Sequence, residues 1–163
     1  MRKILEATSL AALALMLWIT WAALHGPEPL PERIPVHFDA AGVANGWGPP
    51  STLIFLPVIA VVIYLIVTVV SLLPTGIKSS TPLTPESREQ IQALTRRMLA
   101  WLKLELVGLF LCIQWFILSG IREGSNNIPP LAVPAFLVAI FVNVGWHLVA
   151  VFRSMRLAER RVT

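Results

Sequence analysis

The sequence predicts an all-α membrane protein with four transmembrane helices, both termini in the cytoplasm, and a structured outer loop between the first two helices. Hydrophobic residues make up 56% of the 163-residue chain and charged residues only 13%, whereas soluble domains carry about 25% charged residues. Four apolar runs each have the length that a helix needs to cross the hydrocarbon of a bilayer. They cover residues 4–24, 53–73, 99–121 and 131–152.

The first run, residues 4–24, follows Arg2 and Lys3, as the hydrophobic part of a signal peptide would. We favour a retained transmembrane helix, because the run is long and no small-residue cleavage site precedes the Pro-rich segment after His25. The second run, 53–73, must also be helical, because lipid cannot satisfy a free backbone N–H or C=O group.

A helix start is predicted ahead of the third run. Thr84 supplies a capping hydroxyl, Pro85 suits the first turn, and Glu86 lies near the positive end of the helix dipole. We expect this helix to continue directly into the run 99–121. Two consecutive prolines at 129–130 then restart the chain for the fourth run.

The distribution of Lys and Arg sets the expected orientation. The N-terminus, the linker 74–98 and the C-terminal tail hold two, four and four basic residues, whereas the outer loop 25–52 and the loop 122–130 hold one each. The linker and both termini are therefore expected in the cytoplasm. The arginines of the tail should lie against anionic lipid headgroups, and four arginines on a short tail are weak evidence for nucleic-acid binding. The loops are too short to build a second core, so residues 1–163 should form a single membrane domain.

Three predicted spans bring polar side chains to one level in the cytoplasmic half of the membrane. Thr68 lies in the second span, Glu105 in the third, and Asn143 and His147 share one face of the fourth. We expect a buried cluster, which is either a hydrogen-bonded structural clasp or a proton-coupled or ligand-binding site that uses Glu105 and His147. A metal site has the least support, because the carboxylate and the imidazole lie on different helices without a metal-binding spacing.

Other residues of the spans have simpler expected roles. Lys103 points away from Glu105 and can extend its amine to the cytoplasmic headgroups, while Glu6 lies at the headgroup boundary and needs no special role. Gln114 faces the side opposite Glu105 and should make a second contact between helices. Cys112 is expected to be a small packing residue. We find no nucleophile–base pair, no phosphate-binding loop and no metal motif, so neither an enzyme nor a cofactor is expected.

The outer loop 25–52 is polar and is punctuated by Pro and Gly. Pro35 fixes its own φ and extends the residue before it. Gly42 and Gly46 can adopt positive φ and fold the segment back. Asp39 can accept a hydrogen bond from a backbone N–H in a turn. These features predict a shaped loop rather than a slack linker.

The same loop supplies the candidate binding residues, which are Arg33, His37, Asp39 and Trp47. His37 either holds the loop closed by a hydrogen bond or belongs to a contact surface for an extracytoplasmic partner. A third alternative is a metal site formed by His25, His37 and Asp39, for which the imidazole and carboxylate ligands would be suitable.

The loop also carries an ordered set of residues: Leu30, Pro31, Ile34, Pro35, His37, Phe38, Gly42 and Trp47, followed by Leu56 and Pro57. This set resembles the pattern LPxxIPxHFxxxGxxxxW of the bacterial membrane family called domain of unknown function 1648. The resemblance covers about residues 10–70. Many relatives carry a Lys shortly after the Trp, whereas this chain has Gly-Pro-Pro-Ser at 48–51, so a role that depends on that amine is not carried over.

The family is similar to the N-terminal part of SdpI-type proteins, which give immunity to a secreted toxic peptide and can relay its presence to a repressor. The resemblance implies a small bacterial protein of the cytoplasmic membrane that binds or senses an extracytoplasmic ligand or toxin peptide. The second membrane domain of those proteins is not recognisable in residues 85–163. The alternative is a small proton-coupled transporter that uses the buried Glu/His cluster. Expected partners are membrane lipids, an extracytoplasmic peptide or small ligand, and further copies of the chain.

Overall fold

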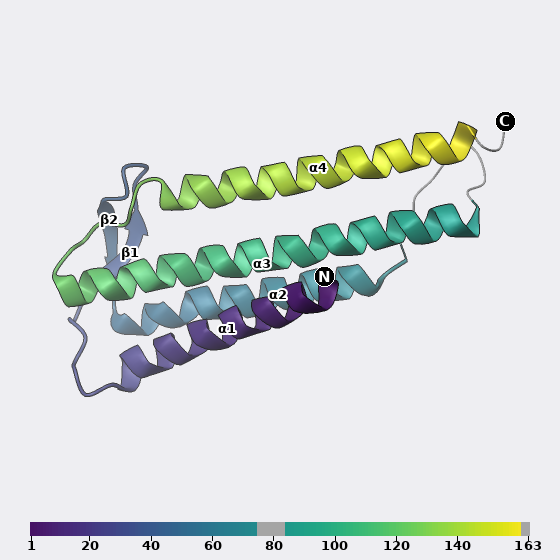
Figure 1. Ribbon diagram of the computed structural model, residues 1–163. Helices are drawn as coiled ribbons and strands as arrows, with labels where there is room; N and C mark the ends of the chain where they lie inside the picture. Colours follow the sequence, from purple (N-terminus) through teal and green to yellow (C-terminus); the bar gives the residue numbers. More distant parts are fainter. Residues whose placement is uncertain (75–83, 161–163) are drawn as a thin grey trace.

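The computed structural model describes residues 1–74 and 84–160 and places four long helices and one β-hairpin in them (Figure 1). All four helices are long and apolar enough to cross a membrane, which indicates a multi-pass membrane protein. The hairpin adds a small sheet to the expected all-α fold. In chain order, the elements are α1 (Arg2–His25), β1 (Ile34–Phe38), β2 (Ala44–Gly48), the 3₁₀ helix η1 (Pro50–Ile54), α2 (Phe55–Leu72), α3 (Pro85–Glu123) and α4 (Ala132–Arg160).

Residues at the two ends of α3 account for where this helix begins and where it ends. The Thr84 hydroxyl accepts a hydrogen bond from the Ser87 N–H at 3.3 Å, and Pro85 occupies the first turn. Gly124 closes the helix in the left-handed conformation, at φ 66°. The predicted start at Thr84 is therefore confirmed, and 85–98 is helical. The part of the linker at 75–83 lies outside the described residues, as does Arg161 of the basic tail.

Helix α3 is the centre of the bundle, because each of the other three helices packs against it. In Figure 1, α1 and α2 lie along one side of α3, and α4 lies along the other. The hairpin sits at the end of the bundle where α1 ends and α2 begins; we call this the hairpin end. The buried core near it contains Ile19, Ile34, Leu53, Ile117 and Leu118.

A buried ion pair joins the three helices on one side of the bundle. Lys103 of α3 is only 1% exposed and forms a salt bridge with Glu6 of α1. Its amine also donates to the Thr68 hydroxyl of α2 at 3.2 Å and lies 4.8 Å from the centre of the Tyr64 ring. The expectations that Lys103 extends to headgroups and that Glu6 has no role are wrong. The face of α3 that carries Lys103 is covered by α1 and α2, so pairing with a carboxylate replaces solvation by headgroups.

We predict that Lys103→Met destabilises the protein by about 3 kcal/mol, because it leaves the Glu6 carboxylate unpaired. This is the lower end of the range for a buried pair, since Glu6 keeps 30% exposure. The double variant Glu6→Leu/Lys103→Met should regain most of this loss. Thermal unfolding in detergent, followed by circular dichroism, measures both effects. Lys3→Met, at an exposed lysine, is the matched control. Equal stability of Lys103→Met and this control would show that the ion pair contributes nothing.

Candidate functional site

The hairpin is anchored to the bundle through its first strand. Strand β1 pairs antiparallel with β2, with Ile34 opposite Gly48 and His37 opposite Gly46, and its register is irregular around His37. The Ile34 side chain is completely buried in the core between the helices. The hairpin is thus held against the helices by an apolar side chain.

The turn of the hairpin is built by Asp39 and Gly42. The Asp39 carboxylate accepts hydrogen bonds from the Ala41 and Val43 N–H groups, both at 2.9 Å. Gly42 has φ 78°, and its N–H donates to the Asp39 carbonyl at 2.9 Å. The expected roles of Asp39 as a backbone acceptor and of Gly42 as a positive-φ residue are confirmed. The Gly42 carbonyl in turn accepts from the Ile128 N–H at 2.9 Å.

Gly46 behaves differently from the expectation, because its φ is not positive. It lies in β2 directly opposite His37, and an added Cβ would stand 2.8 Å from the His37 Cβ. A glycine is required there by close approach of the strands rather than by a turn.

The loop between α3 and α4 pairs with the hairpin turn. The Ala44 N–H donates to the Asn126 carbonyl at 3.0 Å, and Val43 forms an isolated antiparallel bridge with Asn127. Sequence reasoning missed this contact, because it joins residues far apart in the chain that carry no side-chain signal for pairing. The turn 39–43 and the segment 126–128 together form one cover over the hairpin end, which we call the lid.

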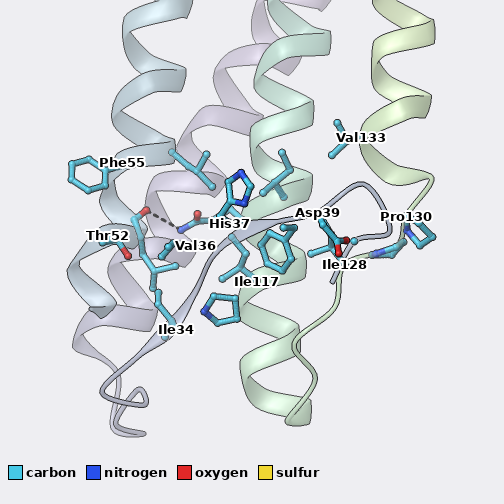
Figure 2. Close-up of a pocket in the computed structure, with 18 of the residues that line it drawn as sticks. Ile34, Val36, His37, Asp39, Thr52, Phe55, Ile117, Ile128, Pro130 and Val133 are labelled. Carbon is cyan, nitrogen blue, oxygen red and sulfur yellow. Dashed lines mark hydrogen bonds between the residues drawn. The ribbon is translucent and has the colours of Figure 1, made fainter. Parts of the chain in front are cut away.

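A cavity of about 690 Å³ lies beneath the lid. Figure 2 shows its lining residues between the end of α2 that carries Phe55 and the end of α4 that carries Val133. Most of the wall is apolar, with Ile117 of α3 and Ile128 of the lid among its residues. Its polar side chains are those of His37, Asp39, Thr52 and Gln114.

The structure divides the four predicted binding residues of the outer loop. His37 and Asp39 line the cavity, whereas Arg33 and Trp47 do not. His37 Nδ1 is hydrogen-bonded to the Asn45 side chain across the hairpin. Arg33 donates to the Trp47 carbonyl at 3.2 Å, and the Trp47 side chain is 40% exposed. These two residues therefore brace the hairpin from outside the cavity.

The suggested metal ligands do not come together. His25 lies at the end of α1, where Nδ1 is 3.0 Å from the Trp21 carbonyl and the ring stacks on Trp21. Within residues 1–74 and 84–160, no three His, Cys, Asp or Glu side chains are close enough to share a metal ion. His37 and Asp39 instead form hydrogen bonds within the hairpin.

The expected polar cluster is split between two faces of α3. Glu105 accepts a hydrogen bond from the Asn143 amide of α4 at 2.9 Å, and His147 Nδ1 lies 2.9 Å from the Asn143 carbonyl. Thr68 instead bonds to Lys103 on the other side. Lys103 and Glu105 are two residues apart, which places them about 200° apart around the helix. The prediction of a single cluster is therefore wrong. Glu105, Asn143 and His147 do line one cavity of about 440 Å³ between α3 and α4.

Comparison with known families finds a match over the region that contains the hairpin. Residues 11–61 match the family described as "Domain of unknown function (DUF1648)". The match runs from the first half of α1 through the hairpin and η1 into α2. No match was found among curated proteins or among solved structures. Over residues 11–61, about a third of its length, this chain is therefore similar to the family of domain of unknown function 1648.

Proposed function

We propose that this is a protein of the bacterial cytoplasmic membrane that binds an extracytoplasmic ligand, either a small molecule or part of a secreted peptide, in the cavity beneath the lid. The cavity is the observation that carries the proposal. Its volume of about 690 Å³ falls within the range of about 300–1,000 Å³ that is usual for small-molecule sites. A mostly apolar wall with a few polar groups is also typical of such sites.

Immunity or signalling of the SdpI type is one role that such binding would serve. In that role, the protein would meet the secreted peptide at the outer surface of the membrane. The lid and the rim residues His37 and Asp39 would lie on that surface if the basic residues orient the chain as expected. The cavity would then hold one or two apolar side chains of the peptide.

The orientation itself can be tested with single cysteines. In a Cys112→Ser background, we expect Ala41→Cys, at an exposed position of the hairpin turn, to react with a membrane-impermeant maleimide in intact cells. Gln90→Cys, at an exposed position near the start of α3, should react only after the cells are permeabilised. The opposite pattern would place the hairpin in the cytoplasm and exclude an extracytoplasmic ligand.

Ligand binding can be tested by filling the cavity. Val133→Phe introduces an aromatic ring at the cavity wall, whereas Val138→Phe makes the same change on the same helix at a side chain that is 62% exposed. Each protein, in lipid nanodiscs, is incubated with culture supernatant and membrane extract of its natural host. Released compounds are then quantified by mass spectrometry. We expect at least one compound to be retained by wild type and Val138→Phe but reduced about tenfold or more in Val133→Phe, which corresponds to a loss of about 1.4 kcal/mol.

Equal recovery of all compounds from Val133→Phe and Val138→Phe would contradict binding in this cavity. A stability measurement of both variants checks that each remains folded.

A second candidate function is proton-coupled transport through the site between α3 and α4. It is favoured by the hydrogen bond from Asn143 to Glu105 and by His147, which is 8% exposed beside them. A carboxylate within an apolar helix is costly and is often part of a proton pathway.

We predict for this second function that Glu105→Gln abolishes proton flux into proteoliposomes under an imposed membrane potential, because an amide cannot carry the proton. A pH-sensitive dye trapped inside the vesicles measures the flux. Glu89→Gln, at an exposed position of α3, should transport like wild type. Flux that is absent from wild type, or unchanged in Glu105→Gln, would exclude transport at this site.

A further inference from the structure

The side chain of Gln114 is completely buried in α3 and lines the cavity beneath the lid. Its nitrogen donates two hydrogen bonds, to the Thr20 hydroxyl of α1 at 2.9 Å and to the Leu53 carbonyl of η1 at 3.2 Å. A carbonyl oxygen can only accept, so the Leu53 contact requires the nitrogen of the amide on that side. The Thr20 hydroxyl gives its own hydrogen to the Met16 carbonyl at 2.8 Å, so it also accepts from Gln114. These contacts fix the orientation of the amide.

The oxygen of the same amide is left without a partner. Gln114 Oε1 is buried and has no hydrogen-bond partner within the described part of the chain. The other polar side chains of the cavity do not supply a donor to it. The Asp39 carboxylate accepts from backbone N–H groups, the Thr52 hydroxyl donates to the Pro49 carbonyl, and His37 Nδ1 bonds to Asn45. A buried carbonyl without a donor costs free energy, so a donor from within the cavity would stabilise this arrangement.

The walls of the cavity indicate what else the donor should carry. Leu56 comes from α2, Ile113 and Ile117 come from α3, and Val133 comes from α4. Figure 2 shows the cavity between α2 and α4, and the Phe55 side chain at its α2 edge is 61% exposed. An apolar chain would therefore find apolar side chains of α2, α3 and α4 to lie against in this cavity. A charged group would lose its solvation there, which favours a neutral donor.

We propose that the cavity takes a lipophilic molecule with a neutral hydrogen-bond donor, a hydroxyl or an amide N–H, that binds Gln114 Oε1 while its chain lies on the apolar wall. This inference rests on the proposed function and names the class of its ligand. The acyl tail of a bilayer lipid matches the wall but offers no donor, so it would leave Gln114 Oε1 unpaired.

A pair of matched probes tests the proposal. In the methyl ether of a photoactivatable diazirine analogue of decanol, a methyl group replaces the hydroxyl hydrogen that could bind Gln114 Oε1, and the rest of the molecule is the same as in the alcohol. Both are added to wild-type protein in nanodiscs, and their concentrations are expressed per lipid. Labelled peptides are mapped by mass spectrometry. We expect labelling of residues 113–117 and of Val133 to reach half its maximum at about five- to tenfold lower concentration for the alcohol, the factor that one hydrogen bond provides.

Two variants assign the preference to the amide oxygen. In Gln114→Met, the ether and the alcohol should reach half-maximal labelling at about the same concentration. Thr20→Val removes one acceptor of the amide nitrogen but leaves Oε1 in place, so it should keep the preference for the alcohol. Retention of that preference by Gln114→Met, or its loss in Thr20→Val, would contradict the assignment.

The outcomes separate this inference from the proposed function. Equal labelling by both probes in wild type would overturn the inference and indicate that water satisfies Gln114 Oε1, while ligand capture that depends on Val133 could still stand. If neither probe labelled the cavity, and Val133→Phe and Val138→Phe captured compounds equally, both the inference about Gln114 and the proposed ligand binding would be overturned.

Discussion

The need to pair polar side chains inside apolar helices organises this bundle. Three polar side chains in the apolar part of α3 bond to other elements, whereas the Ser119 hydroxyl donates within α3 itself. Lipid offers few alternatives to these hydrogen bonds, so each of them fixes which neighbour lies on which face of α3. Lys103 bonds to Glu6 and Thr68, Glu105 bonds to Asn143, and Gln114 bonds to Thr20 and Leu53.

The same requirement acts on the backbone at the hairpin end. The turn at Gly42 needs a positive φ, and an added Cβ there would stand 2.2 Å from the Ile128 carbonyl. This close approach lets the turn 39–43 pair with the segment 126–128, which leads into α4. The lid thereby joins the region that matches the family, residues 11–61, to the C-terminal half of the chain. The cavity beneath it depends on both halves, because its walls come from the hairpin, α2, α3 and α4.

Local features of this fold could be predicted from the sequence, whereas contacts between distant segments could not. The apolar runs gave the spans, and the side chains of Thr84 and Asp39 act on backbone groups within four residues of their own positions. The expectation that the Lys103 amine extends to the headgroups is wrong because this depends on which helix covers the face of α3 that carries Lys103. Here α1 covers it and supplies the Glu6 carboxylate. The prediction of a single polar cluster is wrong for the same reason, since the depth of Thr68 in the membrane does not determine on which side of α3 it lies.

The two candidate sites differ in how far the chain satisfies its own polar groups. Glu105 and Asn143 hydrogen-bond to each other across α3 and α4, so a role in holding these helices together already accounts for their half-buried position. Gln114 is also bonded to its neighbours through its nitrogen, but this residue lines a cavity and its oxygen has no partner in the described residues. A paired polar group needs nothing from outside the chain, whereas an unpaired one gains free energy from a bound donor. This difference, rather than the depth or charge of either group, is our reason for proposing ligand binding beneath the lid ahead of transport between α3 and α4.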